Sequence, residues 1–233
     1  MFGGCYDPRL TDCFSGKDYS PSAIGTGFLF TSWVQGGYAK NCLSIGGNFG
    51  WRWGDGDGTD ASINAMSLTG CVGDQAKTAS FAPYGIDRLQ ISGGYGASQR
   101  PGSRIVNIGD YAREVTIDGG FKAENGATNG IVINAGARRT RLAGIDAISC
   151  SLDTANTYHG VYAADNAQDF QIDGIRALNK TGYYTGTQAY GVAIGTGCDN
   201  YTLVNNSLRG NQTGGILNNS AAATNKVIAN NLT

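Results

Sequence analysis

Two stretches of this 233-residue chain combine aromatic and polar side chains in a way that suits sugar recognition. They read CSLDTANTYH at 150–159 and KTGYYTGTQAY at 180–190. A sugar ring stacks its C–H face on an aromatic ring, while its hydroxyl groups form hydrogen bonds with polar neighbours. The alternative is that the two stretches cover each other and their tyrosines pack together. The first interpretation predicts a binding site with the candidate residues Tyr158, His159, Tyr183, Tyr184 and Tyr190, beside Asp153.

Three aspartates are the candidates for catalysis, namely Asp118, Asp146 and Asp173. Inverting glycosidases use two carboxyl groups that lie ~6.5–9.5 Å apart. Asp118 and Asp173 occupy equivalent positions two repeats apart, which predicts a separation of ~9.6 Å if the repeats stack as strands. Asp146 and Arg176 face each other on successive repeats, where a weak surface ion pair is expected, although Arg176 is also a candidate for binding substrate. These acids do not converge, so the sequence leaves enzymatic activity undecided.

The element that positions these residues is a sequence repeat that occurs four times in about the last hundred residues. Its copies begin at Gly130, Gly160, Gly191 and Gly215, which are 30, 31 and 24 residues apart. Counted from the glycine, positions one and three are mostly aliphatic, position seven is small, and positions ten and twelve are mostly apolar. Such alternation marks short strands with one buried face. A repeat of this length without a helical pattern predicts a parallel β-helix. The aliphatic residue at position twelve is Leu142, Ile172, Leu203 and then Val227.

Two further features of the repeat lead to structural predictions. Position fifteen changes from isoleucine in the first two copies to Asn206 and Asn230, and stacked asparagines at a corner bond to one another and to the backbone. The distance from position twelve to the next glycine varies. The long stretches 150–159 and 180–190 follow successive coils, so we expect them to project from one edge, one above the other.

The N-terminal part of the chain is less regular. Residues 1–54 hold all three tryptophans between pairs of glycines, which fits either a cap over the open core or an anchoring segment. In the stretch that follows, Thr59 or Asp60 is a suitable N-cap for a short helix over about 61–68, with Ile63 and Met66 on one face. A strand, a turn and a second strand are then expected within 78–94.

The stretches GDGTDASINAM (56–66) and SFAPYG (80–85) resemble the N-terminal signature of pectate-lyase-like proteins and phage tailspikes. The signature is shortened, since a residue is missing between Gly58 and Thr59 and Ala61 replaces its second acid. The resemblance implies an all-β fold, a right-handed parallel β-helix with a short N-terminal capping helix. It divides the chain into a cap or anchor at 1–54 and a β-helix domain at 55–233. The chain stops at Thr233 just after a coil's last aliphatic residue. Either the sequence is truncated there or another subunit covers that end, as in the homotrimers typical of tailspikes.

Composition narrows the classes of function. A net charge of −1 without a basic patch argues against nucleic acid, and no run approaches the ~20 apolar residues of a membrane span. The N-terminus lacks the features of a signal peptide. Six cysteines without C-x-x-C pairs or clustered histidines predict no metal site, and no cofactor is expected. A Cys5–Cys13 bridge stays open as an alternative, and Cys198 is expected to be a small buried hydrophobe.

Two hypotheses for function follow. The first is a virion-associated spike or fibre protein, phage or phage-like, that binds bacterial surface polysaccharide through loops on one edge of the β-helix. It would be part of the virion, or extracellular after host lysis, with other virion proteins as partners. The second is a polysaccharide-degrading enzyme, a lyase or glycoside hydrolase of the pectate-lyase-like group. Both share a fold, and a fold alone does not decide function.

Overall fold

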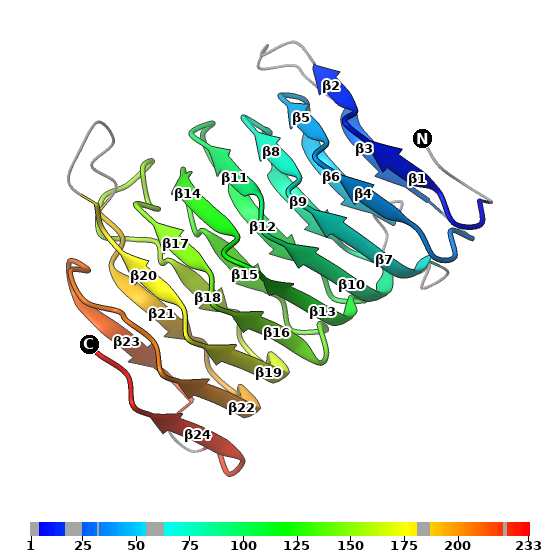
Figure 1. The fold of residues 1–233 in the computed structure, drawn as a ribbon. Helices are drawn as coiled ribbons and strands as arrows, with labels where there is room; N and C mark the ends of the chain where they lie inside the picture. Colours follow the sequence, from blue (N-terminus) through cyan, green and yellow to red (C-terminus); the bar gives the residue numbers. More distant parts are fainter. Residues whose placement is uncertain (1–4, 17–24, 32, 55–62, 181–186, 221–222) are drawn as a thin grey trace.

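The chain is a right-handed parallel β-helix built from three sheets that run along one axis (Figure 1). The computed structural model describes residues 5–16, 25–31, 33–54, 63–180, 187–220 and 223–233. Neighbouring strands in each sheet are parallel and come from successive coils. The described residues contain no helix, and therefore none that could cross a membrane. The predicted fold is confirmed.

We name the sheets A, B and C, and the coils pass through them in the same order, except that isolated bridges at Ser207 replace the strand of sheet C between β22 and β23. Sheet A consists of β3 (Thr26–Phe30), β6 (Phe49–Trp53), β9 (Ala79–Pro83), β12 (Arg104–Ile108), β15 (Ile131–Ile133), β18 (Val161–Ala163), β21 (Tyr190–Ile194) and β23 (Gly214–Asn218). Sheet B consists of β1 (Arg9–Thr11), β4 (Tyr38–Lys40), β7 (Ile63–Thr69), β10 (Ile86–Ser92), β13 (Arg113–Asp118), β16 (Thr140–Ala143), β19 (Gln168–Asp173), β22 (Asp199–Val204) and β24 (Lys226–Ala229). Sheet C consists of β2 (Phe14–Gly16), β5 (Leu43–Ile45), β8 (Val72–Asp74), β11 (Tyr95–Ser98), β14 (Lys122–Gly126), β17 (Asp146–Ile148) and β20 (Arg176–Leu178).

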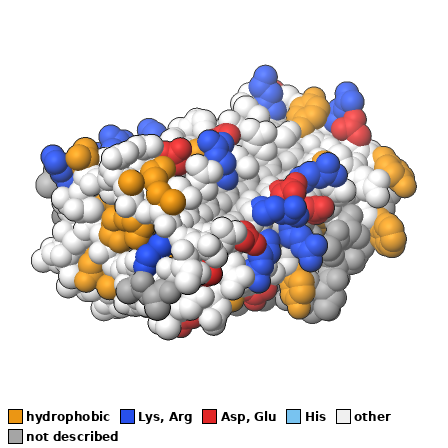
Figure 2. All heavy atoms as spheres, turned by 90° about the horizontal axis from the view of Figure 1, so that it is seen from below, with side chains coloured by type: hydrophobic (Ala, Val, Ile, Leu, Met, Phe, Trp, Pro, Cys, Tyr) orange, Lys and Arg blue, Asp and Glu red, His pale blue; other side chains and the backbone are white. Residues whose placement is uncertain are grey.

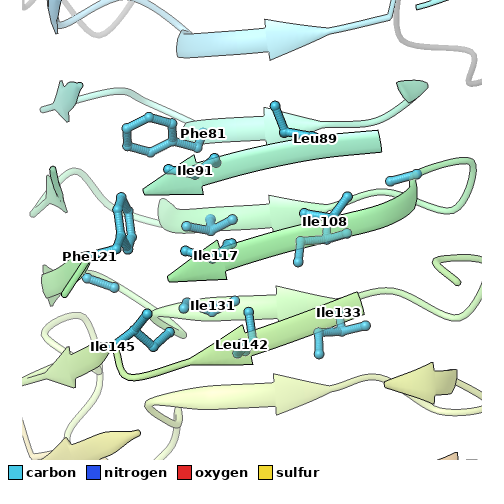
Figure 3. Packing of buried hydrophobic residues seen from close by; sticks show 14 of the residues in the cluster. Phe81, Leu89, Ile91, Ile108, Ile117, Phe121, Ile131, Ile133, Leu142 and Ile145 are labelled. Carbon is cyan, nitrogen blue, oxygen red and sulfur yellow. The ribbon is translucent and has the colours of Figure 1, made fainter. Parts of the chain in front are cut away.

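The interior is filled by columns of aliphatic side chains, one from each coil. Ile131, Ile133 and Leu142 are fully buried, and Figure 3 shows them stacked with their counterparts from the coils before. Residues at one position of the repeat pair across the sheet, as Ile131 does with Val161. Alternation of buried and exposed residues along each strand therefore produces one continuous core.

The glycine that leads each copy of the repeat stands where two coils approach closely. A Cβ atom at Gly160 would lie 2.7 Å from the carbonyl oxygen of Gly191, which is far inside normal contact. Gly130 is in the same situation, since its Cβ would lie 2.6 Å from the carbonyl oxygen of Gly160. The recurrence of glycine in the sequence thus reflects backbone packing at a corner.

The helix predicted over 61–68 is wrong, because Ile63–Thr69 is strand β7 (residues 61 and 62 lie outside the described part). Ile63, Met66 and Leu68 all point into the core. Ala65 has a φ of 57° and inserts one extra residue into the alternation, so buried positions come three apart before they come two apart. This bulge imitates the spacing of a helix face.

The last coil is shifted by one residue from the predicted alignment. Leu203 pairs with Ile228 rather than with Val227, which is half-exposed. Ile194 pairs with Asn218, so the connection to the next strand spans 228 − 218 = 10 residues instead of 203 − 194 = 9. The asparagine stack forms with the same shift. The side chain of Asn206 donates to Oδ1 of Asn231 at 2.9 Å, and Asn230 does not take that place.

The first 54 residues contribute strands to the same three sheets. Strand β6 pairs with β3 on one side and with β9 on the other, so sheet A continues past residue 54. Whether this segment also anchors the chain to another protein stays a prediction. The Cys5–Cys13 bridge is not formed, and Cys198 is buried as expected.

Candidate functional site

The described parts of the two long connections lie side by side at the edge between sheets C and A, where both were predicted (residues 181–186 lie outside the described part). Residues 149–160 lead into β18, and the connection after β20 leads into β21 (Figure 1). The backbone N–H of Asn156 donates to the carbonyl of Thr187 at 2.6 Å, and that of Ala189 donates to the carbonyl of Tyr158 at 2.7 Å. The described parts of the loops therefore continue the parallel pairing of the coils along this edge, which we call the ridge.

Three rings lie together where this ridge meets sheet A, and we call His159, Tyr162 and Tyr190 the aromatic ledge. The ring of His159 is 5.8 Å from that of Tyr162 and 5.8 Å from that of Tyr190, measured between centroids. All three side chains are half-buried. Tilted rings at this separation pack favourably while part of each face stays accessible.

The ledge is built by the register of the coils. His159 and Tyr190 stand directly before the leading glycines 160 and 191, so they occupy one column, in which Asn129 is the preceding member. Oδ1 of Asn129 accepts a hydrogen bond from the backbone N–H of His159 at 2.8 Å. Tyr162 comes from the neighbouring column, between Val132 and Ala193. The ledge thus lies where the end of a loop meets the paired strands of sheet A.

Burial sets the electrostatics of the ledge. It lowers the pKa of His159 from 6.5 to about 4, so the imidazole is neutral at neutral pH. Its Nδ1 atom is buried and has no hydrogen-bond partner in the described part of the chain. Burial, followed by the nearby carboxylate of Asp165, raises the pKa of Tyr162. The ledge is therefore an uncharged surface, suited to stacking rather than to binding ions.

The other loop candidates have different surroundings. Tyr158 is half-buried, its backbone N–H donates to the hydroxyl of Ser151 at 2.9 Å, and no ring contact joins it to the ledge within the described part. Asp153 accepts a hydrogen bond from the backbone N–H of Gly102 at 2.6 Å and so fastens its loop to the connection two coils before. Tyr183 and Tyr184 lie outside the described residues.

The structure places Asp118 and Asp173 in one column on the outer face of sheet B, two coils apart. Asp118 ends β13, and Asp173 ends β19. The side chain of Gln90 donates to Asp118 at 3.3 Å, and that of Asn205 donates to Asp173 at 3.1 Å. Stacked strands set the two carboxylates ~9.6 Å apart, which is the upper limit of an inverting pair.

Asp146 and Arg176 form the ion pair that the sequence predicts. Nε of Arg176 lies 3.0 Å from Oδ1 of Asp146, and an Nη atom lies 2.6 Å from Oδ2, so the contact is bidentate. This hydrogen bonding raises the pKa of Arg176. A guanidinium held in this way has less capacity left for a substrate, and an exposed pair of this kind contributes less than about 1 kcal/mol to stability.

The predicted catalytic and binding residues are not brought together. Asp118, Asp146 and Asp173 lie at the corner between sheets B and C, whereas the ledge lies at the corner between C and A. Strands of sheet C such as β17 have three residues, which span ~10 Å. Within one coil, sheet C therefore stands between the carboxylates and the ledge, and the two groups do not form a single site.

Tyr162 belongs to the site but was not predicted from the sequence. It is at position two of the repeat, an outward position between the buried positions one and three. An alignment of the outward positions would have placed it one column from His159 and Tyr190. The prediction was based on the aromatic residues of the loops and did not consider the outward residues of the strand.

Among solved structures, the fold is similar to that of tailspike protein 2 from the Escherichia coli O157:H7 bacteriophage CAB120. The TM-score is 0.58 at 15% sequence identity, and the match covers 91% of this chain and 28% of the tailspike chain. The chain thus spans a little over a quarter of the tailspike's length. At such low identity, this likeness establishes the fold alone.

Two polysaccharide-modifying modules have lower similarity. The A-modules of the mannuronan C-5 epimerases AlgE4 and AlgE6 from Azotobacter vinelandii match with TM-scores of 0.47 and 0.42, each at 14% identity. The matches cover 99% and 89% of this chain, and 83% and 60% of the respective modules. No protein-family model and no curated protein matches the sequence.

Proposed function

We propose that this chain is the β-helical part of a virion-associated spike and that it binds bacterial surface polysaccharide at the aromatic ledge. The observation that carries the proposal is the cluster of His159, Tyr162 and Tyr190 beside two stacked loops. Similarity of fold to a phage tailspike over 91% of the chain supports the spike assignment. The ledge keeps His159 and Tyr190 of the predicted loop candidates and adds Tyr162.

The ledge has the properties that a sugar ring requires. Its rings are uncharged at neutral pH and partly exposed, so they offer apolar faces to the C–H groups of a pyranose. The loops beside it present hydroxyl and amide groups, such as those of Thr213 and Asn156, which bond to each other at 2.6 Å. Successive coils repeat at ~4.8 Å, so an extended chain of sugars meets equivalent groups along the axis.

Loss of a ledge ring is expected to weaken polysaccharide binding. Tyr162→Ala and Tyr190→Ala should each reduce affinity about 2- to 12-fold, since an aromatic contact contributes about 0.5–1.5 kcal/mol. Binding is measured on an array of purified lipopolysaccharide O-chains and capsular polysaccharides, followed by titration calorimetry on the best ligand.

Two controls make this test specific. Tyr38→Ala removes a tyrosine that is 38% exposed on sheet B, away from the ledge, and it should leave affinity unchanged. His159→Phe keeps a ring in the cluster and should retain binding. Equal affinity of the wild type and of the Tyr162→Ala/Tyr190→Ala double variant would contradict the ledge as the binding surface.

The spike proposal includes assembly and location. We expect a homotrimer, attachment to other virion proteins, and a place in the virion or outside the host after lysis. Light scattering of the purified chain together with its neighbouring virion proteins tests the assembly. A chain that stays monomeric with them at all concentrations would count against it.

The alternative is a polysaccharide-degrading enzyme, a lyase or glycoside hydrolase. It is favoured by Asp118, which lines a hollow on sheet B and has one buried oxygen without a partner among the described residues. Under the binding proposal, incubation with the polysaccharides that bind should release no new reducing ends and no unsaturated sugars. Turnover that is lost in Asp118→Asn or Asp173→Asn, with binding retained, would establish the enzyme instead.

A further inference from the structure

The outer face of sheet B carries a long hollow, well separated from the ledge. Three adjoining depressions of about 500, 460 and 500 Å³ make it up. The first two share Glu114, Thr116 and Arg141, and the last two share Arg139 and Asp169. They therefore form one continuous depression that follows the axis from β7 to β22, and we call it the furrow.

The floor of the furrow is a ladder of polar side chains, one from each coil. Strand pairing aligns Thr116 with Gln90 on one side and with Arg141 on the other. Ser67 and Gln171 continue the ladder at its two ends. Each of these groups is a hydrogen-bond donor, and they recur at the ~4.8 Å spacing of the strands. Such a row suits an extended chain whose units carry hydroxyl groups.

The acidic groups of the furrow already have partners. Glu114 is paired with Arg139 at 3.0 Å, and Asp169 bonds to Asn200 and lies 3.9 Å from Arg138. Asp110 accepts the backbone N–H of Gly136 at 2.9 Å. Asp118 accepts from Gln90 with one oxygen, and its other oxygen is buried without a partner in the described part of the chain. Figure 2 shows acidic and basic side chains gathered in such a mixed cluster on the face seen from below.

Three arginines of the furrow have no acidic partner. Arg88 bonds only to the amide oxygen of Asn64. The side chains of Arg141, on the floor, and Arg113, at the edge, are exposed, and neither makes a hydrogen bond or ion pair within the described part of the chain. Five arginines and four carboxylates line the furrow, so its net charge is 5 − 4 = +1, although the whole chain has a net charge of −1. A guanidinium binds carboxylate, sulfate and phosphate groups through two parallel hydrogen bonds.

We propose that the furrow is a second glycan site, which takes a chain substituted with carboxylate, sulfate or phosphate groups, with Arg141 bound to one of them. This goes beyond the proposed function, because the ledge lies on sheet A and is uncharged. Two unpaired arginines are too few for the multiple phosphate contacts on which nucleic-acid affinity depends, so a glycan is favoured over a nucleic acid.

Three dextrans of matched length test the proposal, because they share a backbone and differ only in charge: dextran, carboxymethyl dextran and dextran sulfate. Affinity electrophoresis of the full chain should show retardation by one or both charged dextrans and none by neutral dextran. Arg141→Gln should weaken that binding about 10-fold or more, the usual effect of losing a charge-assisted hydrogen bond. Arg113→Gln should weaken it less, because that side chain lies at the edge.

The matched control is Arg209→Gln. Arg209 is also exposed and without a partner in the described residues, but it lies at the corner between sheets C and A. An unchanged affinity of Arg141→Gln, or an equal loss in Arg209→Gln, would overturn the proposal, as would equally tight binding of single-stranded DNA. The ledge variants Tyr162→Ala and Tyr190→Ala should bind charged dextran normally, so failure of the furrow and failure of the ledge are told apart.

Discussion

Replacing Trp51 with alanine is expected to destabilise the fold by about 3–5 kcal/mol, the usual cost of removing a large aromatic side chain from a core. Trp51 is fully buried in sheet A. Its ring stacks on Phe28 at 4.2 Å and on Phe81 at 6.2 Å, from the coils before and after it. Its Nε1 donates to the carbonyl of Val72 at 2.9 Å, so the variant also leaves a carbonyl without its partner.

Urea denaturation followed by circular dichroism measures this loss. The matched control is Trp33→Ala, since Trp33 is 68% exposed and its removal should change stability by less than about 0.5 kcal/mol. A loss below about 1 kcal/mol for Trp51→Ala would mean that the first coils are not packed onto the rest. Similar losses for both variants would contradict the burial described for them.

This result would also separate two roles of the N-terminal segment. The sequence showed aromatic residues at high density, which fits a cap and an anchor equally well. Their spacing held more information, because Phe28 and Phe30, like Trp51 and Trp53, are two residues apart and point to the same side of a strand. In the structure these four residues are buried. Composition alone could not show this, whereas period-two alternation could.

The fold was predictable because each coil repeats the same core positions, and strand pairing carries the pattern along the axis. Local irregularities were not predictable, since they add one residue to a coil without changing its composition. Ala65 adds such a residue inside β7, and the connection before β24 adds another. The first imitated a helix, and the second moved Val227 and Asn230 out of their expected columns. Both errors arise from the same cause, a shift of register by one residue.

The candidate site depends on contacts between side chains of neighbouring coils. Only the outward positions of the repeat hold these side chains. His159 and Tyr190 could be predicted, because they precede leading glycines in successive coils. Tyr162 and Arg141 could not be selected by type or spacing, since each is one exposed residue among many. Their importance follows from neighbours on adjacent coils, a ring 5.8 Å away for Tyr162 and a ladder of donors for Arg141.

The second large effect is expected on acidification, and it arises from His159. Its pKa of about 4 in the folded protein is below the ordinary 6.5, because burial disfavours the charged ring. The unfolded chain therefore binds the proton first as the pH falls. The contribution of neutral His159 to the free energy of unfolding is complete above pH 6.5 and is lost as the pH falls from 6.5 to about 4. This difference between the pKa of His159 in the unfolded and folded states corresponds to about 3 kcal/mol. Partial exposure of the ring reduces the expected loss in free energy of unfolding to about 2 kcal/mol.

His159→Phe removes this titration while it keeps a ring between Tyr162 and Tyr190. The free energy of unfolding of the wild type should fall by about 2 kcal/mol more than that of the variant between pH 7 and pH 4. The carboxylates of the two proteins are the same, so any contribution from them cancels in the difference. Parallel pH profiles would show that the imidazole is solvated in the folded state. Since the ledge requires an uncharged ring, that outcome would also remove the electrostatic basis for sugar stacking at His159, while Tyr162 and Tyr190 would still offer their faces.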